Sequence, residues 1–142
     1  MNADFPQRFA EIFASLNKTN LHRVAEIYTE AVHFTDPLHD IQGIEPMQTY
    51  FDQLYSNIDD LQFEFHQCQQ VTEGQGLLRW TMTYRHPRLA RGNPISVEGC
   101  SCIFFQEGRV YRHIDYFDAG ALLYEHVPLL GTAIRWLKGR LA

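Results

Sequence analysis

Two segments far apart in the chain place carboxylates where acid–base chemistry would be expected. Asp36 ends a short apolar strand and precedes Pro37, and Asp115 stands inside a second apolar strand near the end of the chain. A carboxylate among apolar residues is costly unless it is paired, hydrogen-bonded or held neutral. Two such carboxylates in a small domain therefore predict a polar site inside an apolar pocket.

The chemistry that fits this site is proton transfer next to a carbonyl group. One carboxylate would remove the proton, and the other, or His113, would donate to the oxygen that becomes negative. If Phe117 points inward, a period of two puts Asp115 and His113 on the same inner face. Asp118 then points outward and can cap the following helix, so we favour Asp115 over Asp118. The catalytic candidates are Asp36, Asp115 and His113.

Each candidate also has a simpler structural interpretation. Asp36 can be only a turn residue, because Asp before Pro is a common turn starter. The His113 ring can simply hydrogen-bond a carboxylate without taking part in the reaction. Metal binding is a weaker hypothesis, since the spacing of His33, Asp36 and His39 fits no familiar zinc pattern. The sequence therefore predicts no metal site, and it implies no cofactor.

The elements that must position these residues follow from the spacing of apolar residues. Helical spacing covers residues 5–31, with an interruption at 17–20, and returns at 44–58, where Tyr50 is one of the apolar positions. From Leu61 onward the period changes to two. The strands predicted from these patterns are 32–35, 61–72, 78–85, 95–105 and 109–117. Helices followed by four antiparallel strands predict an α+β fold, a cone-shaped curved antiparallel sheet wrapped around the N-terminal helices with a pocket at its open end.

One strand supplies most of the expected pocket wall. Trp80, Met82 and Tyr84 share one face, whereas Arg79 faces the other way. We expect these three residues and Phe117 to contact a small lipophilic ligand. The Tyr84 hydroxyl is a candidate polar contact, although an aromatic residue on a strand face is more often part of the core.

The composition indicates which kinds of binding partner and which cellular compartment to expect. A net charge of −5 argues against a nucleic-acid surface. No signal peptide and no membrane-spanning run is present, and Cys68, Cys100 and Cys102 lack disulfide or zinc spacing, so we expect a cytoplasmic protein. Cys100, Cys102 and Phe104 make the outer face of the sheet apolar, which predicts a homodimer.

We expect residues 1–142 to form a single domain, with 128–142 as a C-terminal amphipathic helix after a break at Pro128. Arg135, Lys138 and Arg140 alternate there with apolar residues, which makes the helix basic in an acidic protein. The favoured interpretation is that its apolar side packs on the body or on a second subunit. The alternatives are that it lies on a membrane surface or covers a lipophilic pocket.

The order of elements and several motifs resembles the nuclear transport factor 2-like superfamily, and specifically its SnoaL-like polyketide cyclase and ketosteroid isomerase-like branch. The resemblance covers about residues 5–125 and implies the α+β cone. This fold hosts isomerases, cyclases, hydrolases, dehydratases and non-catalytic binders. The residues that carry the resemblance are 13–17, 21–28, Phe34 to Pro37 with Gly43, 104–110 and 113–118.

The resemblance also assigns roles to particular positions. In ketosteroid isomerases an Asp followed by Pro is the general base, and Asp36 matches that position. Those enzymes form an oxyanion hole from a Tyr and a protonated Asp, but alignment puts Ile12 and Ser101 at these places, so this oxyanion hole is missing. Ser101 is kept as a substrate-contact candidate. In SnoaL-like cyclases a carboxylate on the last strand is the acid–base group, and Asp115 or Asp118 can fill that role here, of which we favour Asp115.

The sequence is compatible with two functions. One is an acid–base isomerase or cyclase that acts on a small lipophilic carbonyl compound. The other is a non-catalytic ligand-binding or protein-interaction module of the same fold. The carboxylates and His113 favour the enzyme, whereas the missing oxyanion groups favour the binder.

Overall fold

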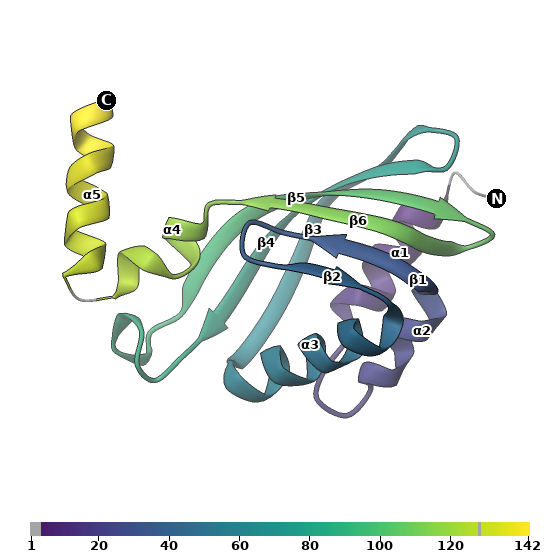
Figure 1. Ribbon diagram of the computed structural model, residues 1–142, viewed down its shortest axis with the longest axis horizontal. Helices are drawn as coiled ribbons and strands as arrows, with labels where there is room; N and C mark the ends of the chain where they lie inside the picture. The colour runs from purple at the N-terminus through teal and green to yellow at the C-terminus, as the bar shows by residue number, and fades with distance from the viewer. Residues whose placement is uncertain (1–3, 128) are drawn as a thin grey trace.

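Six strands form one curved sheet in the order β2-β1-β6-β5-β4-β3. The computed structural model describes residues 4–127 and 129–142. Figure 1 shows the sheet curling over helices that lie on its concave side. The strands are β1 (Tyr28–Thr35), β2 (Asp40–Gln42), β3 (Asp59–Thr72), β4 (Gln75–Arg85), β5 (Ile95–Gln106) and β6 (Arg109–Phe117). The helices are α1 (Phe5–Ala14), η2 (Leu21–Arg23), α2 (Val24–Ile27), α3 (Ile44–Asn57), η3 (Ala90–Gly92), α4 (Ala119–Leu122), η4 (Tyr124–His126) and α5 (Leu130–Leu141).

Alternation along the strands decides which side chains enter the cone. In β4 the side chains of Leu78, Trp80, Met82 and Tyr84 are buried, whereas Arg79 is exposed on the outer face. An antiparallel sheet with one face on the core requires this pattern. The predicted α+β cone is confirmed, and the inner face of β4 is the predicted one.

The first strand is longer than predicted, and its partner was not expected. The helical spacing that runs from Leu21 to Tyr28 predicts a helix that continues to about Ala31. In the structure Tyr28 to Ala31 begin β1, which pairs in parallel with β6, so that Phe34 lies opposite His113. The sheet is therefore mixed rather than purely antiparallel. A short strand, β2, was also missed, since three residues are too few to show a period.

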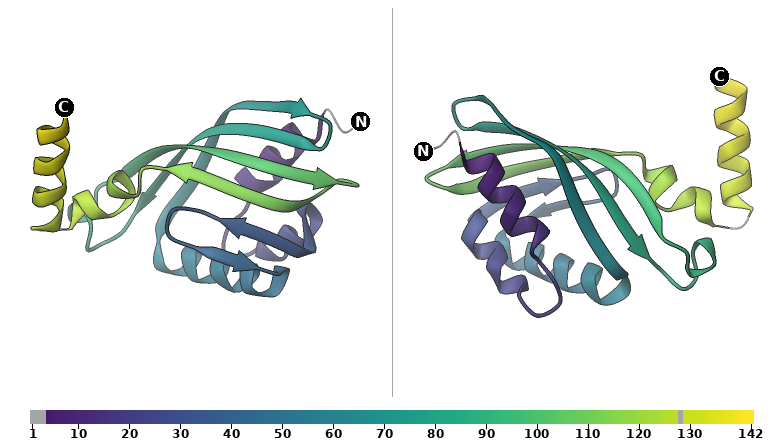
Figure 2. Two further views of the ribbon diagram at one scale, coloured as in Figure 1. Left: turned by 45° about the horizontal axis from the view of Figure 1, so that its top comes forward. Right: turned by 180° about the vertical axis from the view of Figure 1, so that it is seen from behind.

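Aromatic side chains from α1 fill the closed end of the cone. Phe5, Phe9 and Phe13 are buried one turn apart on the face of α1 that meets the sheet. The helix α3 contributes Met47 and Phe51 from the other side. Figure 2 shows α1 and α3 lying together on the concave side, whereas the far end of the sheet extends beyond them. The core is thus dense at one end, and the other end leaves room for a cavity.

The C-terminal segment leaves the body of the molecule. Asp118 caps α4 as predicted, because its Oδ1 accepts from the backbone N–H groups of Gly120 and Ala121 at 2.9 and 3.2 Å. The helix α5 then projects from the end of the sheet (Figure 1). Several of its large apolar side chains are exposed: Leu130, Trp136, Leu137 and Leu141.

The expectation that the apolar side of α5 packs on the body is therefore wrong for a single copy of the chain. Packing on a second subunit stays a prediction, and the predicted break at Pro128 lies outside the described residues. Within residues 4–127 and 129–142, no helix is both long and apolar enough to cross a membrane.

One lysine joins α5 to the end of the sheet. Lys138 Nζ lies 2.9 Å from Asp118 Oδ2 and 2.9 Å from Glu125 Oε2. The hydrogen bond from Lys138, followed by those from the α4 backbone, lowers the pKa of Asp118 below its usual range. A carboxyl whose folded-state pKa is depressed stabilises the fold above its unfolded pKa, and this contribution is lost as the pH falls through the folded value.

We therefore expect α5 to detach in acid before the body unfolds. Below about pH 4, where carboxyl groups begin to protonate, hydrogen exchange should speed up in α4 and α5 while the inner strands stay protected. Lys138→Met is the matched control, because it removes the cation and should make exchange in α5 fast at every pH. An unchanged pH profile in Lys138→Met would contradict this role of Lys138.

Candidate functional site

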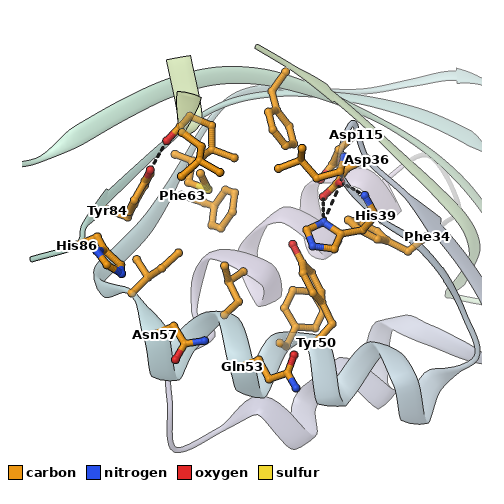
Figure 3. Close-up of a pocket in the computed structure, with 18 of the residues that line it drawn as sticks. Phe34, Asp36, His39, Tyr50, Gln53, Asn57, Phe63, Tyr84, His86 and Asp115 are labelled. Carbon is orange, nitrogen blue, oxygen red and sulfur yellow. Dashed lines mark hydrogen bonds and ion pairs between the residues drawn. The ribbon is translucent and has the colours of Figure 1, made fainter. Parts of the chain in front are cut away.

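A cavity of about 560 Å³ opens between α3 and the concave face of the sheet. Its wall is mainly aromatic and aliphatic, and Figure 3 shows side chains from α3, β3 and β4 pointing into it. The four predicted wall residues line this cavity: Trp80, Met82, Tyr84 and Phe117. The volume and lining are typical of a site for a small lipophilic molecule.

The two predicted carboxylates both reach this cavity, whereas two other candidates lie behind it. Asp36 and Asp115 line the same cavity. Ser101 and His113 instead line a void of about 10 Å³ behind Asp115. Ser101 therefore contacts Asp115 rather than the ligand space, which differs from the expectation that it would contact substrate. The register of β5 against β6 explains this, because Ser101 on β5 lies directly opposite Asp115 on β6.

Asp115 is held by a buried chain of hydrogen bonds. Its Oδ1 accepts from Ser101 Oγ at 2.5 Å and lies 2.6 Å from His113 Nε2. Trp80 Nε1 donates to Ser101 Oγ at 2.8 Å, and the Tyr28 hydroxyl lies 2.7 Å from His113 Nδ1. The Asp115 side chain is 14% exposed, and its Oδ2 has no hydrogen-bond partner in the described part of the chain. One oxygen is thus fixed and the other is free.

The donor and acceptor roles in these hydrogen bonds follow from the Trp80 indole at one end of the network. The Trp80 indole can only donate, so the Ser101 hydroxyl accepts from it and donates to Asp115. His113 Nε2 donates to the same carboxylate oxygen, which leaves Nδ1 of a neutral ring to accept from Tyr28. Burial and the charge of Asp115 raise the pKa of Tyr28 well above its usual value, so its hydroxyl keeps the proton that it donates. Within this network Asp115 Oδ2 is the one acceptor without a partner among the described residues.

The imidazole of His113 is one of the most enclosed polar groups of the protein. It is 1% exposed, and the rings of Phe9 and Phe34 lie 5.8 and 4.9 Å from it, both edge-on. A polar group in such surroundings is expensive unless each of its atoms has a partner. Tyr28 and Asp115 supply those partners, and they fix the orientation of the ring.

We expect Tyr28→Phe to destabilise the protein by about 1–3 kcal/mol, because it leaves His113 Nδ1 buried without a partner. Equilibrium unfolding in urea measures the change. Tyr111→Phe is the control, since Tyr111 is 45% exposed and should lose almost nothing. Equal midpoints for the two variants would show that the hydroxyl of Tyr28 contributes no stability.

Asp36 is both a turn residue and a cavity residue. Its Oδ1 accepts from the backbone N–H groups of Leu38 and His39 at 2.8 and 2.7 Å, which closes the turn before β2. The His39 ring adds a third contact, with Nδ1 at 3.0 Å. The side chain is only 4% exposed. The same ring nitrogen lies 3.2 Å from Asp36 Oδ2, so both oxygens of Asp36 have a partner, whereas Asp115 keeps one oxygen free to accept a proton from a ligand.

Tyr50 is a cavity residue that the sequence did not single out. It comes from α3, and Figure 3 shows its hydroxyl pointing toward Asp36 and His39. Burial, followed by the charges of Asp36 and Asp115, raises the pKa of Tyr50 well above its usual value. Its hydroxyl therefore stays protonated and can donate. In the sequence Tyr50 is one of the apolar positions of a predicted helix, which indicates a core residue. Its hydroxyl was the one sign that it could also make a polar contact.

Two other polar groups of this region are engaged elsewhere. The Tyr84 hydroxyl donates to the backbone oxygen of Leu122 and so holds α4 beside the cavity. His33 Nε2 lies 2.6 Å from Asp40 Oδ1, and His39 pairs separately with Asp36. No group of three or more His, Cys, Asp or Glu residues that could hold a metal ion occurs among the residues that the structure describes.

Comparison with protein families and solved structures places this architecture among known proteins. A family model described as the SnoaL-like domain matches residues 9–113. No curated protein matches the chain.

Solved structures agree on the fold at low sequence identity. TsrD from Streptomyces laurentii is 20% identical with a TM-score of 0.72, over 86% of this chain and 94% of that one. An epoxide hydrolase of M. tuberculosis, described as LEH-like, is 16% identical with a TM-score of 0.70, over 84% and 86% of the two chains. A protein with a ketosteroid isomerase-like fold from Catenulispora acidiphila, solved with trimethylamine, is 10% identical with a TM-score of 0.75, over 90% and 96%. At these identities the likeness shows the fold alone.

Proposed function

The chain belongs to the SnoaL-like family, and we propose that it binds a small lipophilic carbonyl compound in its cavity and catalyses proton transfer next to the carbonyl. The observation that carries the proposal is the position of Asp115. One carboxylate oxygen is fixed by Ser101 and His113, and the other is free in an apolar cavity. A general base needs this combination of fixed orientation and one unoccupied oxygen.

In the proposed reaction Asp115 Oδ2 takes a proton from the carbon beside the carbonyl. The electrons of the broken C–H bond move toward the carbonyl oxygen, and an enolate forms. The Tyr50 hydroxyl is the proposed donor to that oxygen, in place of the oxyanion hole that the resemblance lacks. Asp115 then returns the proton to another carbon, which is an isomerisation. Alternatively, the enolate carbon attacks a second carbonyl of the ligand, and the alkoxide that forms takes the proton from Asp115, which is a cyclisation.

The remaining candidates support these two groups. We propose that His113 acts through Asp115, as a positioning residue that holds the carboxylate and stabilises its charge. Asp36 is the second carboxylate of the cavity, and it faces Tyr50 together with His39 (Figure 3). The wall residues Trp80 and Met82 would exclude water from the reacting carbon.

Proton exchange tests the proposal without knowledge of the natural substrate. Steroid-, terpenoid- and polyketide-like ketones are first screened by thermal shift, and those that bind are incubated with the protein in D₂O. NMR then follows the loss of the protons beside the carbonyl. Exchange above the buffer rate supports the proposal, and binding without any added exchange contradicts it.

A non-catalytic ligand-binding module is the second candidate, and one observation favours it. Few carboxylate oxygens in the cavity are free to accept a proton, because Asp36 already accepts from two backbone N–H groups and from His39. A single free carboxylate suffices to hold a ligand hydroxyl without any turnover. Ligand binding with no proton exchange is the result that would select this function.

We also propose a homodimer that forms through the outer face of the sheet. Half-buried Cys100, Cys102 and Phe104 on β5 lie beside exposed Tyr111 and Tyr116 on β6. An apolar face of this kind is commonly covered by a second copy. The three cysteines of the chain are free thiols, which supports a reducing compartment such as the cytoplasm.

A further inference from the structure

The cavity is polar at two ends that differ in chemistry. The end at Asp36 and Asp115 presents carboxylate oxygens, which accept hydrogen bonds. The opposite end carries Asn57, His86 and Arg88, which also line the cavity. Figure 3 shows Asn57 and His86 on one side of the cavity, and Asp36, His39 and Asp115 on the other. Between the two ends the wall is aromatic and aliphatic.

The second end is a solvent-facing mouth beside a basic loop; at the first end the cavity residues Leu38 and His39 are also exposed. Asn57 and Arg88 are exposed, whereas the Asp36 and Asp115 side chains are 4% and 14% exposed. The loop between β4 and β5 supplies Arg88, and no Asp or Glu occurs in the sequence between Glu73 and Glu98. Asp59 and Asp60 line a neighbouring pocket with His86, and Asp60 Oδ2 lies 3.4 Å from Arg85 Nε. This positive loop contrasts with the net charge of −5 for the whole chain. Arg88 forms no ion pair with any residue that the structure describes.

The hydrogen bonds of His86 leave a donor at the mouth. Its Nδ1 accepts from the backbone N–H of Arg88 at 3.0 Å, so the proton of the neutral ring is on Nε2. The amide of Asn57 adds two N–H groups and the guanidinium of Arg88 adds five. The mouth thus offers several donors and one free positive charge, which is the set that a carboxylate recognises.

We propose that the ligand carries a carboxylate at the end opposite its reacting carbonyl, and that Arg88 binds this carboxylate at the mouth. The inference rests on the proposed function and adds the class and orientation of the ligand. The carbonyl end enters first, toward Asp115 and Tyr50, and the lipophilic middle lies against Trp80 and Met82. The carboxylate stays at the rim, where water and Arg88 share it, so its desolvation is small.

A matched pair of probes tests this arrangement. Methyl nonyl ketone and its ω-carboxylate differ only at the end remote from the carbonyl, and the methyl ester of the second is a neutral control. The chain has two tryptophans, Trp80 in the cavity wall and Trp136 in α5. A Trp136→Phe background leaves Trp80 as the only tryptophan, so tryptophan emission reports binding in the cavity. We expect the ω-carboxylate to bind roughly tenfold more tightly than the ketone or the ester.

The assignment to Arg88 is tested by one variant and one control. Arg88→Gln should abolish the advantage of the ω-carboxylate and leave the affinity for methyl nonyl ketone unchanged. Arg79→Gln makes the same change of charge on the outer face of β4, and it should keep the advantage. Equal affinities for the carboxylate and the ester in the parent protein would overturn the inference, as would an equal loss in both variants. Failure of every ketone to bind would instead contradict the proposed function.

Discussion

Asp115→Asn is expected to slow proton exchange from a bound ketone by about 10²–10⁴-fold, which is the usual contribution of a positioned general base. The substitution replaces the free, ionised Oδ2 with an atom that accepts protons poorly or not at all. The fixed oxygen can remain, because an asparagine carbonyl still accepts from Ser101 and His113. The loss should therefore fall on catalysis and spare the cavity.

Two comparisons distinguish a loss of catalysis in Asp115→Asn from a loss of folding or binding. Ketone affinity, followed by Trp80 fluorescence, should change little in Asp115→Asn. Asp118→Asn is the control, because Asp118 lies three residues further along, outside the cavity, as the cap of α4. That variant should exchange ketone protons at the parent rate. If Asp115→Asn also exchanged at the parent rate, Asp115 would not be the base.

Gly99→Ala is expected to lower the free energy of unfolding by about 1–3 kcal/mol, as overpacking in a dense core does. Gly99 on β5 lies opposite Trp80 on β4, and the indole ring covers the glycine. A Cβ built at Gly99 would lie 2.2 Å from Trp80 Cη2 and 2.4 Å from Cζ2. No ordinary contact is that short, so the indole must move. Its movement would break the hydrogen bond to Ser101 and deform the cavity wall.

Chemical denaturation measures the loss, and near-ultraviolet circular dichroism reports whether Trp80 has moved. Gly139→Ala is the matched control, because nothing lies within 4 Å of a Cβ at that position in α5. Alanine is about 1 kcal/mol better than glycine inside a helix, so this control should be neutral or slightly stabilising. A Gly99→Ala protein with parent stability and an unchanged tryptophan signal would show that the sheet relaxes without cost.

Local periodicity, together with the inward direction of Phe117 that the resemblance implies, was sufficient to predict one half of the site. Period two along β6 put His113 and Asp115 on the inner face, and period two along β4 put Trp80 there as well. These predictions needed no knowledge of strand pairing, because alternation is a property of each strand alone. The resemblance added the curvature that turns such a face into the wall of a cavity.

The other half depends on pairing between distant segments, which periodicity cannot supply. Tyr28 reaches His113 only because β1 pairs in parallel with β6, and the sequence placed Tyr28 in a helix. Ser101 was identified by alignment as a substrate contact, whereas its strand register sets it behind Asp115. Tyr50 was treated as apolar core, since the sequence does not show which face of α3 meets a cavity.

The position of β6 within the sheet governs the order in which the protein can assemble. It is the last strand along the chain, yet it lies between β1 and β5, so it joins the first hairpin to the rest of the sheet. The bond between Tyr28 and His113 closes a loop of 85 residues. Because the entropy of such a closure is lost before its contacts form, folding should be slow for a chain of this size. During synthesis β1 would wait with an open edge until β6 arrives, and that interval is when the chain is most prone to aggregate.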